Sequence, residues 1–277
     1  MIFENRLFRF YIHSNIHVSL TVYCMVILTG LYFDIDTSDT ASFMGLSAFI
    51  AYNWIRYLKF KGNSLRPDIY FWFDNNKNWL FTLCSVVLVY LITMLSIFDL
   101  HWYLSLLPFL LITFLYMVPI ELLKDNYSLR KIPGIKIFLI SVSWSGLVVL
   151  LPFIHNNVII GIRELLFFLN QFLFVFVLTL PFDMRDVTSD NKELHTIPQV
   201  LGIDKSKALG GVMLLACSVI TYVLFEGILL CSMIGISFIT GVLLLKSTTN
   251  QSKYYSSFWV EGIPIMWFIC LRFLGGM

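Results

Sequence analysis

Nine long apolar stretches constrain the fold of this chain more than any other feature of its sequence. Each is long enough to cross about 30 Å of hydrocarbon as a helix. Backbone N–H and C=O groups inside a bilayer must be bonded within the protein, and a helix satisfies them within a single segment. We therefore expect an all-α, polytopic membrane protein with nine transmembrane helices, forming one domain over residues 1–277. The stretches cover residues 15–33, 41–60, 79–98, 101–119, 136–153, 163–182, 208–225, 227–246 and 256–275.

The composition excludes a water-soluble globule and gives no sign of nucleic-acid binding. Hydrophobic residues make up 58% of the chain and charged residues only 13%, which leaves too little polar surface to face water. The net charge of +2 gives no reason to expect a nucleic-acid partner. The cysteines lie singly within apolar stretches, without the spacing of a zinc or redox site, and we interpret them as small hydrophobic residues.

Two short segments add detail to the expected topology. The first dozen residues mix aromatic and charged side chains, including Arg6 and Arg9, and are typical of an amphipathic segment at the membrane surface. The stretches 208–225 and 227–246 meet at Glu226 and Gly227 and could be interpreted as one long helix. Their combined length far exceeds a bilayer, so we expect a tight hairpin instead.

The positions of the basic residues predict the orientation in the membrane. If the nine stretches cross the membrane in turn, 17 of the 19 Lys and Arg residues lie on the same side of it as the amino terminus. They precede the first stretch or lie at the connections 2–3, 4–5, 6–7 and 8–9; the exceptions are Arg163 and Arg272. Because basic loops stay in the cytoplasm, the amino terminus is predicted to be cytoplasmic and the carboxyl terminus to lie outside. We expect an integral protein of a bacterial inner (cytoplasmic) membrane, in contact with membrane lipids.

An acidic octet, DMRDVTSD at residues 183–190, follows the sixth apolar stretch. Asp183, Asp186 and Asp190 have the spacing i, i+3 and i+7, which places three carboxylates on one face if the helix continues. Like charges beside an apolar helix persist most easily where a cation neutralises them. Carboxylate oxygens suit Mg²⁺, which commonly adds oxygens from a substrate phosphate. A solvated acidic helix end is the simpler alternative.

The octet and its continuation, DMRDVTSDNKELHTIPQVLG, resemble the second aspartate-rich motif of the UbiA-type intramembrane prenyltransferases. The three aspartates match the family's acids, and Thr196, Pro198, Leu201 and Gly202 match the residues that follow them. The segment 115–136 also resembles the family's Tyr-Pro and basic segment before the fifth span. That likeness is carried by Tyr116, Pro119, Arg130 and Lys136.

The resemblance implies a helical bundle with a central cavity that opens to the cytoplasm. In such a cavity a prenyl diphosphate is held through Mg²⁺ by two acidic motifs, and a lipophilic acceptor captures the allylic cation. The octet would supply the second motif. Among the basic residues, the resemblance points to Arg130 and Lys136 as substrate ligands.

The first motif of the family is degenerate in this chain. At its expected place the sequence reads AYNWIRYLKFK, which keeps Asn53 but has Trp54, Tyr57 and Lys61 where the acids should be. A rebuilt site is possible, because Asn53, Arg56 and Tyr57 share a helical face and a guanidinium binds phosphate bidentately. Lys59 could assist Arg56. In the alternative, Arg56 forms a salt bridge with Asp183 or Asp186 and closes an inactive pocket.

Other polar residues give weaker indications. Asp68 and Asp74 are six residues apart and fall on different helical faces, and their aromatic surroundings favour an interfacial segment over a displaced first motif. Asn170 is a candidate substrate ligand within the sixth stretch, although buried amides more often bond between helices. Glu261 within the ninth stretch is a candidate by its position, and His195 beside the octet could act as a base.

Three functions therefore remain open from the sequence. The first is an intramembrane transferase that moves an isoprenyl group from its diphosphate to a lipophilic acceptor, for example an aromatic compound or a quinone precursor. The second is a terpene cyclase of the same superfamily, in which the cation is quenched internally. The third is a non-catalytic member that binds a lipid or quinone. A transporter is disfavoured, because the sequence shows no inverted repeat.

Overall fold

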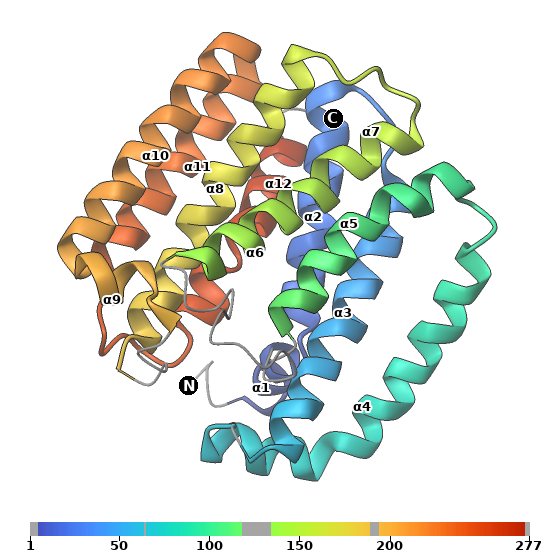
Figure 1. The fold of residues 1–277 in the computed structure, drawn as a ribbon, viewed down its shortest axis with the longest axis vertical. Coiled ribbons are helices and arrows are strands. Elements are labelled where there is room, and N and C mark those ends of the chain that lie inside the picture. Colours follow the sequence, from blue (N-terminus) through green and yellow to red (C-terminus); the bar gives the residue numbers. More distant parts are fainter. Residues whose placement is uncertain (1–4, 64, 118–133, 189–193, 275–277) are drawn as a thin grey trace, which may run out of the picture. The chain divides into compact units, whose positions relative to one another are not determined.

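The regular secondary structure of the described part of the chain is all helical (Figure 1). The structure is a computed structural model, and it describes residues 5–63, 65–117, 134–188 and 194–274. Helices account for 84% of it, and these residues contain no strand, which confirms the all-α prediction. The chain divides into two compact units, Met1–Asp99 and Leu100–Met277, which are described separately below. The prediction of one domain stays a prediction.

Six helical segments of the described residues are long and apolar enough to cross a membrane. A multi-pass membrane protein is therefore supported, as the sequence indicated. The remaining expected stretches, 41–60, 101–119 and 256–275, contain helices in their described residues, but the count of nine crossings stays a prediction. The six segments are Ile16–Phe33, Pro67–Met94, Ile135–His155, Ile162–Asp186, Ile203–Leu224 and Gly227–Lys246.

The first unit consists of the short helix α1 (Arg6–His13) and three long helices, α2 (Ile16–Phe33), α3 (Ser38–Lys61) and α4 (Pro67–Met94). Helices α2 and α3 are packed closely, because Gly45 presents no side chain and its carbonyl accepts a 2.6 Å hydrogen bond from Ser19. The aromatic segment that begins at Pro67 is not separate from the following span. It forms the first turns of α4, and Pro67 suits the first turn of a helix.

The second unit is built around α8 (Ile162–Asp186), which contacts helices on several sides. One neighbour is a continuous helical segment that includes a π-helical turn: α6 (Ile135–Ser145), η4 (Gly146–Leu150) and α7 (Leu151–His155). The others are α9, α10, α11 and η6. The remaining elements are α5 (Leu100–Met117), α9 (Ile197–Leu201), α10 (Ile203–Leu224), α11 (Gly227–Lys246), η6 (Tyr255–Val260) and α12 (Ile263–Leu274).

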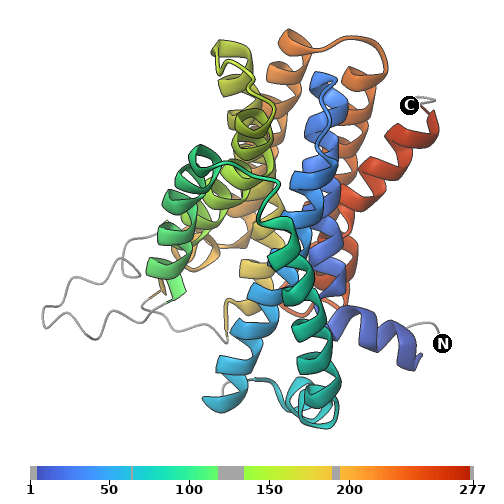
Figure 2. The same ribbon diagram turned by 90° about the vertical axis from the view of Figure 1, so that its right-hand side faces the viewer.

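Small residues let the helices of the second unit approach one another. A Cβ added at Gly210 on α10 would lie 2.5 Å from Leu244 Cδ2 on α11 and 3.0 Å from Leu180 Cδ1 on α8. Gly210 therefore marks the place where three helices meet, as small residues do in membrane proteins. Helices α10 and α11 run side by side and are joined by a tight turn at Gly227, whose φ is 58° (Figure 2). This turn confirms the predicted hairpin.

Candidate functional site

The acidic residues of the octet lie where α8 ends. Asp183 and Asp186 occupy its last turn, one helical turn apart, as their spacing predicts. The helix ends at Asp186, and Asp190 lies outside the described residues. That Asp190 shares a helical face with the other two acids therefore stays a prediction.

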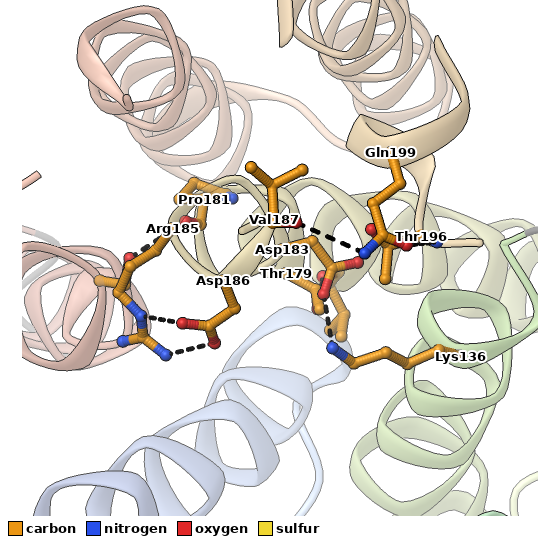
Figure 3. A network of polar contacts seen from close by, with 11 residues as sticks. Lys136, Thr179, Pro181, Asp183, Arg185, Asp186, Val187, Thr196 and Gln199 are labelled. Carbon is orange, nitrogen blue, oxygen red and sulfur yellow. Dashed lines mark hydrogen bonds and ion pairs between the residues drawn. The ribbon is translucent and has the colours of Figure 1, made fainter. Parts of the chain in front are cut away.

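Asp183 is almost fully buried and is paired with a lysine from another helix. Its side chain is 1% exposed, and its Oδ1 accepts a 2.8 Å hydrogen bond from Lys136 Nζ on α6 (Figure 3). Lys136 itself is 18% exposed. A buried carboxylate needs a partner of opposite charge, because the loss of hydration is otherwise costly. Lys136 is thus a predicted site residue that the fold does bring to the octet.

Asp186 is paired with its own neighbour, Arg185. Arg185 donates from Nε to Asp186 Oδ1 and from Nη2 to Oδ2, both at 2.7 Å, in the forked geometry that guanidinium and carboxylate groups favour. The same guanidinium lies 5.4 Å from the centre of the Phe182 ring. Asp186 is 31% exposed, so its carboxylate is open to solvent in a way that Asp183 is not. Each described acid of the octet therefore has a cation beside it.

The backbone of Lys136 is fixed by the segment that follows the octet. The N–H of Gly134 donates to the carbonyl of His195 at 3.1 Å, and a Cβ at Gly134 would lie only 2.8 Å from Ile197 Cδ1. Gly134 has a φ of 73°, which glycine adopts without strain. His195 thus contributes its backbone to the site, and a role as a base stays a prediction. The same following segment also contacts the end of α8: Gln199 Nε2 donates a hydrogen bond to the Val187 carbonyl at 3.5 Å (Figure 3).

A second connection holds the acidic end of α8. The carbonyl of Pro181 accepts hydrogen bonds from Gln251 Nε2 at 2.9 Å and from Ser256 Oγ at 3.3 Å. Pro181 precedes Asp183 by two residues, and the donors follow Pro181 by 70 and 75 residues, in the region after α11. Sequence reasoning missed Gln251 and Ser256, because no local pattern shows which carbonyl a polar side chain reaches.

The candidates of the degenerate first motif belong to the first unit. Asn53 is 5% exposed and bonds to the Ser14 carbonyl at 2.9 Å, and its Oδ1 accepts from Asn15 Nδ2 at 3.1 Å. Arg56 Nη2 donates to Asn15 Oδ1 at 2.6 Å. Asn53 and Arg56 are therefore brought together, through Asn15. Asn15 was not predicted as a site residue; it lies at the break between α1 and α2 and has a φ of 64°.

The remaining candidates of this motif lie apart from that network. Tyr57 stacks edge-on against Phe81 of α4, with ring centres 5.4 Å apart, and packs against a buried aromatic cluster. Lys59 is exposed. Arg130 and Pro119 lie outside the described residues, as does the side chain of Tyr116.

Asn170 connects helices within the second unit. Its Nδ2 donates to the Cys217 carbonyl at 2.8 Å and to Thr221 Oγ1 at 3.0 Å, both on α10. It precedes Asp183 on α8 by a rise of about 20 Å at 1.5 Å per residue. Its amide nitrogen therefore holds α8 to α10, away from the acids, and its role as a substrate ligand stays a prediction.

Asp183 and Asp186 are the described carboxylates at the end of α8 that could hold a magnesium ion. No three His, Cys, Asp or Glu side chains come together among the residues that the structure describes. However, Mg²⁺ in phosphate-binding sites commonly uses one or two carboxylates and takes further oxygens from substrate and water. Asp183 and Asp186 would be such a pair, and each already contacts a basic side chain. The ammonium of Lys136 also shows that Asp183 is placed to hold a cation.

Comparisons of this chain with protein-family models, with curated proteins and with solved structures found no match.

Proposed function

We propose that the protein is an intramembrane transferase that moves an isoprenyl group from a prenyl diphosphate to a lipophilic acceptor. The proposal includes the expected nine-helix, UbiA-like bundle with its cavity open to the cytoplasm. The observation that carries it is Asp183, a buried carboxylate held beside a cation at the end of an apolar helix. A buried ionisable group is costly to desolvate and often has a function. The resemblance of residues 183–202 to an acidic prenyltransferase motif supports the same function.

Asp183 and Asp186, with Asp190, would hold the magnesium ion. When bound, the ion would neutralise the leaving diphosphate and make it a better leaving group. Lys136 would bind a phosphate oxygen as a mobile point charge. The bond between the allylic carbon and oxygen breaks, and its electron pair stays on the diphosphate. The acceptor forms a new bond to the carbocation and gives up a proton, which the released diphosphate can accept. The apolar surroundings of α8 would exclude the water that competes with this acceptor.

Release of pyrophosphate tests the proposal. The purified protein is incubated with Mg²⁺, prenyl diphosphates of several lengths and a lipophilic acceptor, and pyrophosphate is measured with a coupled assay. Asp183→Asn and Asp186→Asn should each lower the rate at least about a hundredfold, a typical loss for charge-stabilising groups. Asp204→Asn, at an exposed acid of α10, is the matched control and should retain the rate. Product analysis separates transfer from internal cyclisation.

A non-catalytic protein that binds a lipid or quinone is the second candidate. It is favoured by the ion pairs of Asp183 with Lys136 and of Asp186 with Arg185, in which basic side chains rather than a metal neutralise these two acids. This function predicts that no prenyl diphosphate is cleaved. It also predicts that Asp183→Ala and Asp186→Ala are tolerated in a cell-based assay whenever the protein still accumulates in the membrane.

A further inference from the structure

The short helix α1 carries two exposed basic residues and one exposed apolar residue. Arg6 and Arg9 are one helical turn apart and share a face, and α1 contains no acidic residue. Leu7 lies on another side of the helix and is 77% exposed. The side chain of Asn5 caps the helix by accepting a 2.9 Å hydrogen bond from the Leu7 N–H. Helices of this kind are typical of a membrane surface, which accommodates apolar and basic side chains together.

The chain changes direction between α1 and α2. Asn15, with a φ of 64°, lies at the break, and Figure 2 shows α1 inclined steeply to α2. Because α2 is long and apolar enough to cross a membrane, α1 is placed to lie along the surface where α2 begins. Two rings of α1 hold it against Trp72 of α4, with ring centres 5.9 Å apart for Phe10 and 5.3 Å apart for His13.

The ends of three helices of the first unit meet at one apolar cluster. Its members are Phe10 of α1, Tyr57 and Phe60 of α3, and Trp72, Phe73 and Leu80 of α4. Basic side chains lie against its rings. The Nζ of Lys61 is 5.2 Å from the centre of the Tyr57 ring, and the Nζ of Lys77 is 5.6 Å from that of Phe60. The cluster therefore gathers basic residues of α3 and α4 at the same end of the unit as α1.

This end of the first unit has an excess of positive charge. Over α1 and residues 53–78 the sequence has seven Lys and Arg residues but only two acids, a net charge of +5. The large apolar side chains of Phe71 and Trp79 on α4 are also exposed here. A matching partner needs both negative charge and apolar chains. A soluble phosphate compound offers only the charge and a zwitterionic lipid carries no net charge, whereas an anionic phospholipid offers both.

We propose that the surface formed by α1 and the first turns of α4 binds an anionic phospholipid. Arg6 and Arg9 contact its headgroup phosphate, and Leu7 packs against its acyl chains. The basic residues around the apolar cluster add to the attraction at longer range. The inference is independent of the proposed function, because it uses neither the acids of α8 nor a metal.

Lipid binding to the purified full-length protein in neutral detergent tests the proposal. Native mass spectrometry measures the affinities for phosphatidylglycerol and phosphatidylcholine with the same acyl chains. Each Lys or Arg near an anionic lipid surface strengthens binding about fivefold. The double variant Arg6→Gln with Arg9→Gln should therefore bind phosphatidylglycerol about 20-fold more weakly than the wild type. Its affinity for phosphatidylcholine should be unchanged.

The double variant Lys205→Gln with Lys246→Gln is the matched control. Both lysines are exposed in the second unit, and the sequence predicts that they lie on the same side of the membrane as α1. Their substitution should change neither affinity. An equal loss of phosphatidylglycerol binding in the two double variants would show that surface charge in general attracts the lipid, and would overturn the assignment to α1.

Leu7→Gln tests the apolar half of the surface. Because Leu7 is exposed, the substitution removes little packing within the unit. It should weaken the binding of phosphatidylglycerol about tenfold, since a leucine side chain no longer leaves water. Glycerophosphoglycerol, the headgroup without acyl chains, should not compete for the site. Competition by this compound, or an unchanged affinity of Leu7→Gln, would indicate a site for soluble phosphates and overturn the proposal.

A measurement on the wild type covers the case in which a variant fails to fold. Phosphatidylglycerol with a photoreactive group on its headgroup is irradiated with the protein in vesicles, and the crosslinked peptides are identified by mass spectrometry. Crosslinks should be severalfold more frequent within residues 5–13 and 66–79 than around Lys205 and Lys246. Crosslinks spread evenly over both units would overturn the proposal.

Discussion

The ion pair between Lys136 and Asp183 should respond asymmetrically to the loss of either member. Lys136→Met leaves a carboxylate that is 1% exposed without its counterion. Removal of one partner from a buried pair destabilises a protein by about 3–5 kcal/mol. Because Lys136 is partly exposed, we expect the lower end of this range, about 3 kcal/mol. Asp183→Asn keeps an oxygen that can accept from Lys136, and the lysine, 18% exposed, can reach water instead. This change should cost only about 1 kcal/mol.

The double variant Lys136→Met with Asp183→Leu completes the comparison. It removes both charges and fills the site with apolar atoms, so it should be within about 1 kcal/mol of the wild type. Asp186→Asn is a control on the same turn, because its partly exposed pair with Arg185 should contribute less than about 1 kcal/mol. The free energy of unfolding is measured by titration with sodium dodecyl sulfate in mixed micelles, followed by circular dichroism.

The asymmetry follows from the difference in burial between the two partners. If Asp183→Asn destabilises the protein as much as Lys136→Met, Asp183 is not the buried member of the pair. A double variant as unstable as Lys136→Met would show that the cost comes from packing around the lysine stem rather than from an uncompensated charge.

Further substitutions test the packing, the support of the site and the topology. Gly210→Ala should destabilise the protein by about 1–3 kcal/mol through overpacking in the same unfolding titration, whereas Gly211→Ala, whose Cβ meets nothing within 4 Å, should not. Gln251→Ala should lower the free energy of unfolding by about 1 kcal/mol, because it loses the bond to α8. Cysteines placed at the exposed loop residues Asn63 and Asn157 should react with an impermeant maleimide from the cytoplasmic and the outer side, respectively. Labelling of both from one side would contradict the predicted orientation.

Much of the fold was accessible from the sequence because apolar stretches of bilayer length have few alternatives to a helix. The hairpin at Gly227 was predictable because the stretches 208–225 and 227–246 together are too long for a single crossing. The junction before α4 was not, since hydropathy alone does not show that the polar and aromatic residues from Pro67 onward continue into the following helix. The elements were thus easier to predict than their ends.

The candidate site was predictable only where one local segment defines it. The spacing of Asp183 and Asp186 placed both acids on one helix, and the fold agrees. The sequence resemblance suggested Lys136 as a ligand of the substrate, but not as the partner of Asp183, which lies 47 residues away. The contact of Asn15 with Arg56 joins residues 41 apart. Such contacts depend on how helices pack, which no local spacing records.

An experimental structure with Mg²⁺ and a non-hydrolysable prenyl thio-diphosphate tests the central claim most directly. The account predicts metal and phosphorus density at the last turn of α8, with the Lys136 ammonium in contact with a phosphate oxygen. A Lys136–Asp183 contact that persists beside an empty helix end, at saturating ligand, would contradict it.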